Sequence, residues 1–130
     1  MKLNREIIWM CLCAMALGAV GCQDPKVDAK RRIKVNDKME ADVWVLQHCK
    51  VTEQPIATAV LLHPWLTDKG YMLGLGESLV REGWDVVLID LRNHGKSTWG
   101  PSGWGALEAR DVRIVMDAVI KEKLVSGDVY

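Results

Sequence analysis

The order of apolar and polar positions along the chain predicts two buried strands joined by a helix. Residues 57–62 and 86–89 are apolar almost throughout, which is typical of strands that are buried on both faces of a sheet. Between them, apolar residues at helical spacing predict a helix from a cap at Thr67 and Asp68 to about Arg81. A strand, a helix and a second strand form a βαβ unit, which implies a parallel sheet with a right-handed crossover.

Weaker patterns flank this unit. A short strand is predicted around residues 32–35, and a partly alternating strand with one wetter face over residues 42–51. A polar loop runs to about position 103, a second helix follows over about 105–123, and residues 129–130 begin another apolar segment. The stripes expected to face the sheet are Met72, Leu75, Gly76 and Leu79 in the first helix, and Val112, Val115, Met116, Val119 and Ile120 in the second.

The first residues have the pattern of an export signal. A basic start precedes residues 7–21, which carry no charge and are too few to span a bilayer. Residues 19–22 (Ala-Val-Gly-Cys) resemble a bacterial lipobox, with Ala19 where Leu is usual. The resemblance implies cleavage before Cys22, a diacylglycerol on its thiol and acylation of the new amine, which makes the lipid bilayer a partner. An ordinary signal peptide that contains a Cys is the alternative.

These features predict an exported, membrane-anchored lipoprotein. Gln23 follows the lipidated position, in place of the Asp that sorting rules associate with the inner membrane, so a periplasm-facing position on the outer membrane is favoured. Cleavage and acylation would remove every cysteine but Cys49 from disulfide chemistry, so no intrachain disulfide is expected. Cys49 is interpreted as a small buried strand residue and not as a nucleophile.

Composition and charge exclude several classes of protein. The chain has 130 residues and is 49% hydrophobic, which is too apolar for disorder and enough for one domain. Its 17 basic residues equal its 17 acidic residues, so no basic surface indicates a nucleic-acid partner. The four cysteines lack the paired spacing of a metal site, and neither a metal nor another cofactor is expected.

Polar residues gather where the predicted fold would place a site. His63-Pro64-Trp65 follows the first buried strand, and Asp90-Leu91-Arg92-Asn93-His94 follows the second. In open parallel sheets, ligand sites form beyond the carboxyl ends of the strands. Gly95-Lys96-Ser97 also suggests a phosphate loop, but the first glycine of that motif would fall at Asp90, whose carboxylate repels phosphate. A nucleotide site is therefore excluded.

Three stretches resemble the α/β-hydrolase family, namely residues 60–65, 83–97 and 104–111. The second follows the family's block of Gly-aromatic, strand and Asp-x-Arg-x-His-Gly-x-Ser, and the pattern is nearest to serine-aminopeptidase-like and esterase-like members. The resemblance implies a partial α/β-hydrolase fold: the first strands, the βαβ unit and two helices of a mostly parallel sheet, truncated before the nucleophile elbow. The predicted organisation is a lipoprotein signal peptide at 1–21, a tether with a possible first strand at 22–41, and the N-terminal part of the hydrolase domain at 42–130.

The resemblance also implies roles in the first loop. Acyl-transfer enzymes hold a tetrahedral oxyanion with two backbone N–H groups, one of which this family places in the loop after its third strand. By resemblance that donor is the N–H of Trp65, with Leu66 as the less favoured candidate. His63 shapes this loop and is not the general base. Pro64 replaces the usual Gly and has no N–H to donate.

The second block is interpreted mainly as a structural turn. Asp90 and Arg92 are expected to pair across it, while His94 and Gly95 complete a tight bend. Two acidic residues near the start of the second helix are expected to favour its dipole; they are Glu108 and Asp111. Two tryptophans either line a substrate cleft or merely cover a loop; they are Trp99 and Trp104.

The catalytic core of a serine hydrolase is missing from the sequence. Gly-x-Ser-x-Gly does not occur, and no acid and His follow such a motif. The leading hypothesis is the N-terminal portion of a membrane-anchored serine hydrolase that cleaves ester or amide bonds in a small-molecule or peptide substrate, incomplete and inactive as this chain. The alternative is a short lipoprotein that uses a remnant hydrolase scaffold as a binding or interaction module.

Overall fold

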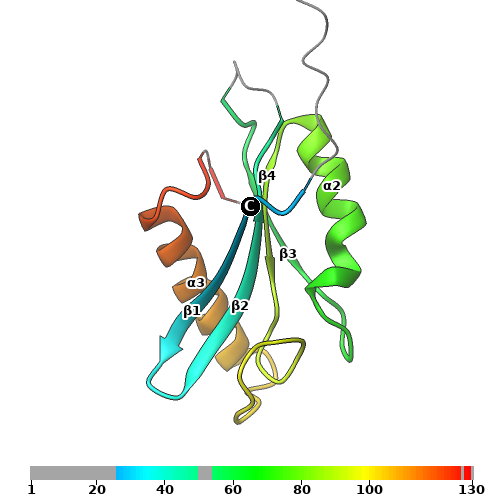
Figure 1. Ribbon diagram of the computed structural model, residues 1–130. Helices are drawn as coiled ribbons and strands as arrows, with labels where there is room; N and C mark the ends of the chain where they lie inside the picture. The colour runs from blue at the N-terminus through cyan, green and yellow to red at the C-terminus, as the bar shows by residue number, and fades with distance from the viewer. Residues whose placement is uncertain (1–25, 50–53, 127, 130) are drawn as a thin grey trace, which may run out of the picture.

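A four-stranded sheet separates two helices, one on each face (Figure 1). The computed structural model describes residues 26–49, 54–126 and 128–129, so the predicted signal peptide and Cys22 lie outside the described residues. The strands lie in the order β1-β2-β4-β3. In chain order the elements are β1 (Ala29–Asn36), β2 (Met39–Leu46), β3 (Thr58–Leu62), the 3-10 helix η1 (Lys69–Met72), α2 (Leu73–Glu82), β4 (Asp85–Ile89) and α3 (Ala106–Lys121).

The predicted βαβ unit consists of β3, α2 and β4. β3 pairs with β4 in parallel, from Thr58 opposite Asp85 to Leu62 opposite Ile89, which confirms the predicted fold class. Val129 makes a further parallel bridge to Thr58. The segment after α3 therefore returns to the sheet beside β3.

The hairpin of β1 and β2 was predicted only in part. β1 begins at Ala29, earlier than the strand expected around 32–35, and β2 covers Met39–Leu46 where 42–51 was expected. β2 also pairs antiparallel with β4, so the described sheet is mixed. The sequence analysis predicted β1 too short because this strand carries many charged residues. In the structure these charged residues alternate with Ile33 and Val35, which are buried.

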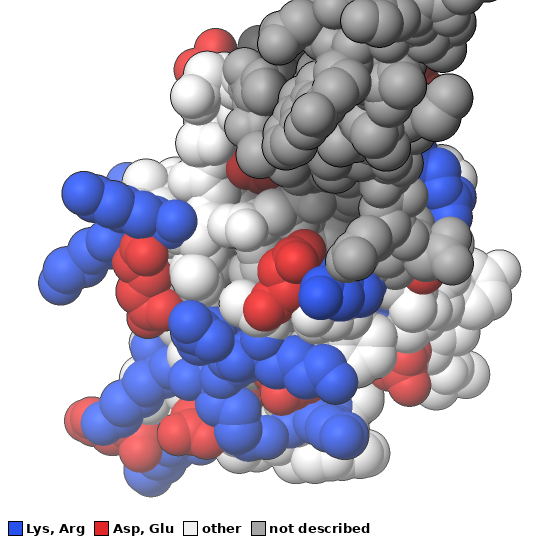
Figure 2. All heavy atoms as spheres, turned by 45° about the horizontal axis from the view of Figure 1, so that its top comes forward, with Lys and Arg blue, Asp and Glu red and all other residues white. Residues whose placement is uncertain are grey.

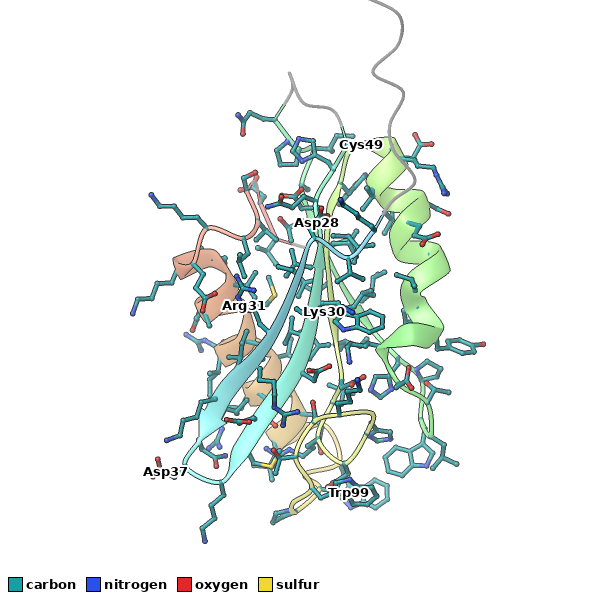
Figure 3. The ribbon with its side chains drawn as sticks, in the orientation of Figure 1. Asp28, Lys30, Arg31, Asp37, Cys49 and Trp99 are labelled. Carbon is teal, nitrogen blue, oxygen red and sulfur yellow. The ribbon has the colours of Figure 1, made fainter. Side chains whose placement is uncertain are left out.

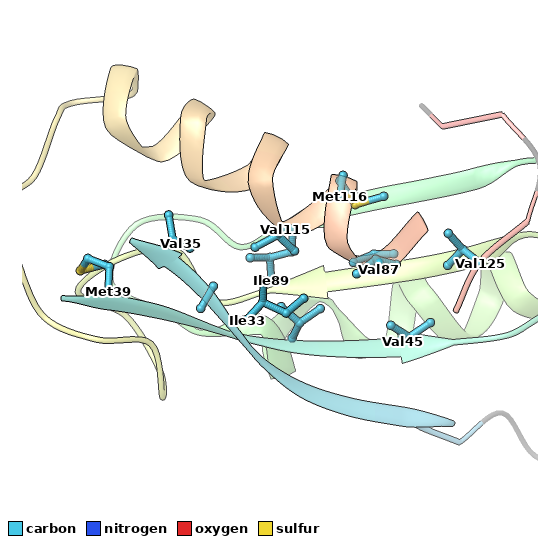
Figure 4. Close-up of a cluster of buried hydrophobic side chains, with 12 residues drawn as sticks. Ile33, Val35, Met39, Val45, Val87, Ile89, Val115, Met116 and Val125 are labelled. Atoms are coloured by element: carbon cyan, nitrogen blue, oxygen red, sulfur yellow. The ribbon is translucent and has the colours of Figure 1, made fainter. Parts of the chain in front are cut away.

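A hydrophobic cluster fills the space between α3 and the sheet. Val115, Met116 and Val119 of α3 are buried there as predicted, against strand residues such as Ile33 and Val87 (Figure 4). The sheet residues come from β1, β2 and β4, so α3 holds the hairpin and the βαβ unit together. The burial of aliphatic side chains from all these elements is the main stabilising contribution to this half of the fold.

The buried face of α2 differs from the predicted stripe. Gly76 is buried as predicted, but Leu75 is half-exposed and Val80 is buried in its place. A Cβ at Gly76 would lie 3.4 Å from a methyl group of Val86, which is an ordinary van der Waals contact, so this position faces the sheet closely. Ile120, predicted to be buried in α3, is also half-exposed. Among the described residues, no helix is long and apolar enough to cross a membrane.

β1 lies at one edge of the sheet and is rich in basic residues. Lys30, Arg32 and Lys34 are exposed on it, and Figure 2 shows Lys and Arg gathered on one face of the molecule with Asp and Glu between them. Arg32 pairs with Glu40 at 3.0 Å, and Lys34 pairs with Asp37 at 3.2 Å. Charged side chains on an edge strand oppose pairing with the edge of a second molecule.

Cys49 is less buried than the sequence predicted. It follows β2 and is only partly buried, whereas a buried strand residue was expected. It is disulfide-bonded in the chain of 130 residues. The expected absence of a disulfide concerns the cleaved and acylated chain, and it stays a prediction.

Candidate functional site

Two loops meet beyond the carboxyl ends of β3 and β4. The first joins β3 to η1 over residues 63–68, and the second joins β4 to α3 over residues 90–105. Figure 3 shows Trp99, which belongs to the second loop, at the end of the molecule opposite Asp28 and Cys49. The parallel pairing of β3 and β4 brings together the described residues that the sequence singled out; they are His63, Trp65, Asp90, Arg92, His94 and Gly95.

His63 connects the two loops through both ring nitrogens. Its Nδ1–H donates to the backbone oxygen of Pro64 at 2.9 Å, and its Nε2 accepts the N–H of Leu91 at 3.1 Å. A ring nitrogen that accepts a backbone N–H carries no proton, so the proton of this ring is on Nδ1. His63 is buried, and its bonds leave no ring nitrogen for proton transfer.

Residues 64–67 form a tight turn with an unusual backbone. The N–H and the hydroxyl of Thr67 both donate to the backbone oxygen of Pro64, at 3.3 and 2.8 Å. Leu66 has a φ of 64°, the left-handed conformation that a type II turn requires at its third position and that side chains other than Gly rarely adopt. Such strain persists only where surrounding contacts enforce it, and it clusters at functional sites.

His94 of the second loop reaches this strained turn. The N–H of Leu66 donates to Nε2 of His94 at 3.4 Å, and Nδ1–H of His94 donates to the backbone oxygen of Arg92 at 2.9 Å. The ring of Trp65 meets the ring of His94 edge-on, with centroids 5.1 Å apart. Of the two candidate oxyanion donors, Leu66 therefore has a hydrogen-bond partner, whereas Trp65 donates none from its N–H within the described part of the chain.

Asp90 fastens both loops to the end of β4. Its carboxylate accepts the N–H and the ammonium of Lys69, at 2.7 and 2.6 Å, and the N–H of Lys96 at 2.8 Å. Its backbone oxygen accepts the hydroxyl of Ser97 at 2.6 Å. Burial raises the pKa of Asp90, but the hydrogen bonds from Lys69 and Lys96 outweigh burial and hold this pKa below its ordinary value of 3.8.

The predicted pairing of Asp90 with Arg92 is wrong. Asp90 pairs with Lys69, while the side chain of Arg92 turns to the opposite side and joins the loop to α3. Its Nε and Nη2 donate to one oxygen of Asp111 at 2.8 and 2.6 Å, and its Nη1 donates to the backbone oxygen of Pro101 at 2.6 Å. Two ion pairs thus hold the first residues of the second loop, one to η1 through Lys69 and one to α3 through Asp111.

Lys69 is a residue of this site that the sequence analysis missed. It is buried between Asp42 of β2 and Asp90, the first residue of the second loop, and its ammonium contacts a carboxylate oxygen of each. The ammonium also lies 4.7 Å from the centre of the Trp44 ring, which is a cation–π distance. The one available signal was Asp42, a carboxylate in a mainly apolar strand, because a buried carboxylate requires a partner.

Gly95 is required by the proximity of Asp90. Its φ is 51°, and a Cβ at this position would lie 2.1 Å from Oδ2 of Asp90. Only glycine lets the backbone of the second loop come this close to the carboxylate. The bend expected at this position is therefore present. Glycine is needed there because the backbone passes close to the carboxylate of Asp90, which also binds Lys69.

Glu108 fixes the far end of the second loop at the start of α3. Its carboxylate accepts the N–H of Gly103 at 3.0 Å, the N–H of Gly105 at 2.8 Å and the hydroxyl of Ser102 at 3.3 Å. Burial raises the pKa of Glu108, but the hydrogen bonds from the backbone of Gly103, Glu108 and Gly105 lower it to about 2. Glu108 therefore caps the helix and orders the loop, beyond the favourable dipole effect expected from the sequence.

The two loops border an open cleft of about 530 Å³, here called the Trp cleft. A smaller hollow of about 230 Å³ adjoins it, shares Trp65 and His94 with it and adds Trp104. Trp99 and Trp104 thus line hollows beside the strained turn. Within the described residues, no cluster of His, Cys, Asp or Glu could hold a metal ion. The lining of the Trp cleft is Trp65, Leu66, Thr67, Asn93, His94, Gly95, Trp99, Gly100 and Ser102.

Solved structures that resemble this chain are α/β hydrolases. An esterase from Pyrococcus furiosus matches with a TM-score of 0.62 and 22% identity, over 73% of this chain and 36% of the esterase. An α/β serine hydrolase homologue from Coxiella burnetii matches with a TM-score of 0.61 and 18% identity, over 80% of this chain and 50% of the homologue. A serine hydrolase without a lid from Xanthomonas campestris matches with a TM-score of 0.60 and 22% identity, over 73% and 45%. By sequence, no family model and no curated protein matches.

The likeness to these proteins concerns the fold, because all three identities are below 25%. The chain spans half or less of the length of each of these solved structures. The described residues comprise a mixed sheet, the parallel pair β3–β4 and a helix on each face. The described residues form part of an α/β-hydrolase fold.

Proposed function

We propose that the protein is a serine hydrolase that cleaves ester or amide bonds, and that this chain provides the oxyanion side of its active site. The observation that carries the proposal is the strained turn of residues 64–67, which lines a cleft beyond the carboxyl ends of β3 and β4. In α/β hydrolases the loop after the corresponding strand supplies one oxyanion donor. We assign this donor to the N–H of Trp65, with the N–H of Leu66 as the second candidate.

In the proposed reaction, the N–H of Trp65 donates to the carbonyl oxygen of the substrate as that oxygen becomes negatively charged in the tetrahedral intermediate. The hydrogen bonds of His63 keep the turn in place, so the donor needs no reorganisation during the reaction. Ser97 is buried and donates to Asp90, which leaves it unsuited to attack a substrate. In this proposal, the serine, acid and histidine of the triad belong to other parts of the whole protein, because no Gly-x-Ser-x-Gly occurs in these 130 residues.

A covalent probe tests the proposed activity. We expect the full-length protein to react with a fluorophosphonate at a serine outside these 130 residues and to hydrolyse p-nitrophenyl esters. The 130-residue chain alone should do neither. Stoichiometric labelling of a serine within this chain, or a full-length protein that is neither labelled nor active, would contradict the proposal.

Trp65→Pro tests the assigned oxyanion donor. Proline lacks the N–H but is favoured at the second position of such a turn, so the turn itself should persist. We expect kcat of the full-length protein for p-nitrophenyl esters to fall by about 100- to 1,000-fold. Trp65→Ala is the control, because it removes the ring but keeps the N–H, and it should change KM more than kcat. Unchanged kcat in Trp65→Pro would show that the donor lies elsewhere.

We also propose that the protein is exported and anchored to a membrane through an acylated Cys22, with the outer membrane favoured in a host that has two. The support is the sequence pattern of residues 7–21 and the lipobox-like residues that end at Cys22. In a bacterial host, Cys22→Ser should abolish labelling by a tagged fatty acid and release the protein from membranes, whereas Cys49→Ser should keep the label. Membrane association that persists in Cys22→Ser would refute the anchor.

A second candidate function is a binding module built on the hydrolase scaffold. It is favoured by the Trp cleft, which is present in a chain without a nucleophile motif. The coding sequence after Tyr130 separates the two candidates. A reading frame that continues into Gly-x-Ser-x-Gly supports the hydrolase, and a stop codon supports the binding module.

A further inference from the structure

The Trp cleft has an uncharged and aromatic lining. Its nine lining residues include no Asp, Glu, Lys or Arg. The ring of His94 accepts the N–H of Leu66 at Nε2 and donates from Nδ1, so it is neutral in this arrangement. A charged group that entered the cleft would leave water without gaining a counterion, which is unfavourable. The lining therefore selects an uncharged ligand.

Three tryptophans border this region and are unusually exposed. The exposed fractions are 63% for Trp65, 77% for Trp99 and 87% for Trp104, and the neighbouring Leu66 is 81% exposed. Single exposed apolar residues are common on protein surfaces, but a contiguous group of large ones marks a binding site. The rings of Trp65 and Trp104 are nearly parallel, with centroids 6.0 Å apart, so both hollows share an aromatic wall.

The loop that carries Trp99 is ordered by its own hydrogen bonds. The N–H of Gly100 donates to Oδ1 of Asn93 at 2.7 Å, and the N–H of Asn93 donates to the backbone oxygen of Thr98 at 3.4 Å. Asn93 has a φ of 66°, a conformation that Asn tolerates better than most residues. These bonds hold Trp99 beside the cleft before any ligand arrives, which lowers the entropic cost of binding.

We propose that the Trp cleft binds a planar, uncharged aromatic group of the substrate, so that the protein acts on aryl esters or aryl amides. The substrate class rests on the proposed hydrolase function, whereas the binding of the aromatic group does not. Indole rings stack on planar aromatic ligands and gain more than the burial of area alone provides. The turn of Trp65 and Leu66 forms part of the cleft wall, so a ligand stacked in the cleft has its carbonyl group beside the candidate oxyanion donors.

Binding of ketones that cannot be hydrolysed tests the proposal without turnover. Three probes are compared by calorimetry on the full-length protein: 2-acetylnaphthalene, its fully saturated decalin counterpart, and 6-acetyl-2-naphthoate, which carries a negative charge. The neutral aromatic ketone should bind at least about tenfold more tightly than either of the others, because only it is both planar and uncharged.

Two variants locate the binding site. Trp99→Ala should weaken the binding of 2-acetylnaphthalene by at least about tenfold. Tyr71→Ala is the matched control, because Tyr71 is 70% exposed but does not line the cleft, and its Kd should equal that of the native protein.

Each outcome decides either this proposal or the proposed function. Tight binding of 2-acetylnaphthalene that depends on Trp99 supports the aromatic site, even if the full-length protein hydrolyses no ester, in which case the hydrolase proposal alone fails. Equal binding of the planar and saturated ketones, binding that survives Trp99→Ala, or no binding at all would overturn the aromatic site. The absence of any binding is the result expected if other residues of the whole protein cover the cleft. Hydrolysis of aliphatic esters would then still support a hydrolase.

Discussion

Lys69→Met removes an ammonium group that two buried carboxylates share. Methionine is unbranched and similar in size to lysine, so the substitution isolates the charge and leaves no large cavity. In the native protein the ammonium contacts Asp42 and Asp90, and the side chains of Lys69 and Asp90 are 4% and 0% exposed. Without the ammonium, two carboxylates would lie close together with no cation between them, which is unfavourable for like charges.

The expected size of the effect follows from the burial of this cluster. Removal of one partner of a buried ion pair costs about 3–5 kcal/mol, because the remaining charge is uncompensated. We therefore expect Lys69→Met to lower the free energy of unfolding by about 3–5 kcal/mol at pH 7, a large part of the ~5–15 kcal/mol of a typical domain. Lys34→Met is the control. Lys34 pairs with Asp37, but its side chain is 64% exposed, so the loss should stay below about 1 kcal/mol.

The loss should also depend on pH. In the native protein, burial raises the pKa of Asp90, but the hydrogen bonds from Lys69 and Lys96 lower it below 3.8. The resulting stability is fully present above the pKa of the unfolded chain and is lost as the pH falls through the lower native pKa. In Lys69→Met burial prevails, so a carboxylate of the pair takes up a proton at higher pH and the repulsion disappears. The difference between native protein and variant should therefore narrow as the pH falls.

Urea unfolding of the protein, followed by circular dichroism at pH 7 and at about pH 4.5, measures both effects. A difference of about 3–5 kcal/mol at pH 7 that becomes smaller at the lower pH agrees with the reasoning. A difference below about 1 kcal/mol, or one that is the same at both pH values, refutes it, because Lys69 would then not be balancing the two carboxylates.

Two further substitutions test the second loop. Gly95→Ala should lower the free energy of unfolding by at least about 2 kcal/mol in thermal unfolding, because its Cβ would lie 2.1 Å from Asp90 at a φ of 51°. Gly74→Ala, in α2 with no atom within 4 Å of the new Cβ, should instead be neutral or stabilising by up to about 1 kcal/mol. Glu108→Gln should cost about 1 kcal/mol at pH 7. The pKa of Glu108 is about 2 against an ordinary 4.5, so its contribution is full above about pH 4.5 and disappears as the pH falls towards 2; a pH-independent cost would contradict this.

The βαβ unit could be predicted from sequence because its signals are local. The runs that became β3 and β4 are apolar on both faces, and few other structures suit such short runs. The bounds of β1 and β2 could not be predicted as well, because Lys30, Arg32 and Lys34 make β1 resemble a solvated tether. These charges alternate with Ile33 and Val35, as in a strand with one buried face. This alternation identifies a strand only once its hairpin partner, β2, is known.

The contacts of the candidate site could be predicted much less well. The sequence places Asp90 and Arg92 two positions apart, which suggested that they pair. In the structure their side chains point in different directions, so Asp90 pairs with Lys69 and Arg92 pairs with Asp111. These partners come from η1 and α3, and their distance in space depends on how both elements pack on the sheet. Leu66 carried no sequence signal either, since its positive φ is imposed by the turn and not by its own preference.

If the protein is anchored through Cys22, the fold determines how the Trp cleft is oriented relative to the membrane, and therefore which substrates reach it. Asp28 donates its N–H to Val45 at the start of β1, and Figure 3 shows Asp28 at the end of the molecule opposite Trp99. β1 has eight residues, which at about 3.3 Å per residue span about 26 Å. A chain anchored through Cys22 would therefore have the Trp cleft directed away from the bilayer, where water-soluble substrates reach it and membrane lipids do not. Anchored protein and the released Cys22→Ser form should accordingly hydrolyse a soluble ester at the same rate, and a clear dependence on anchoring would contradict this orientation.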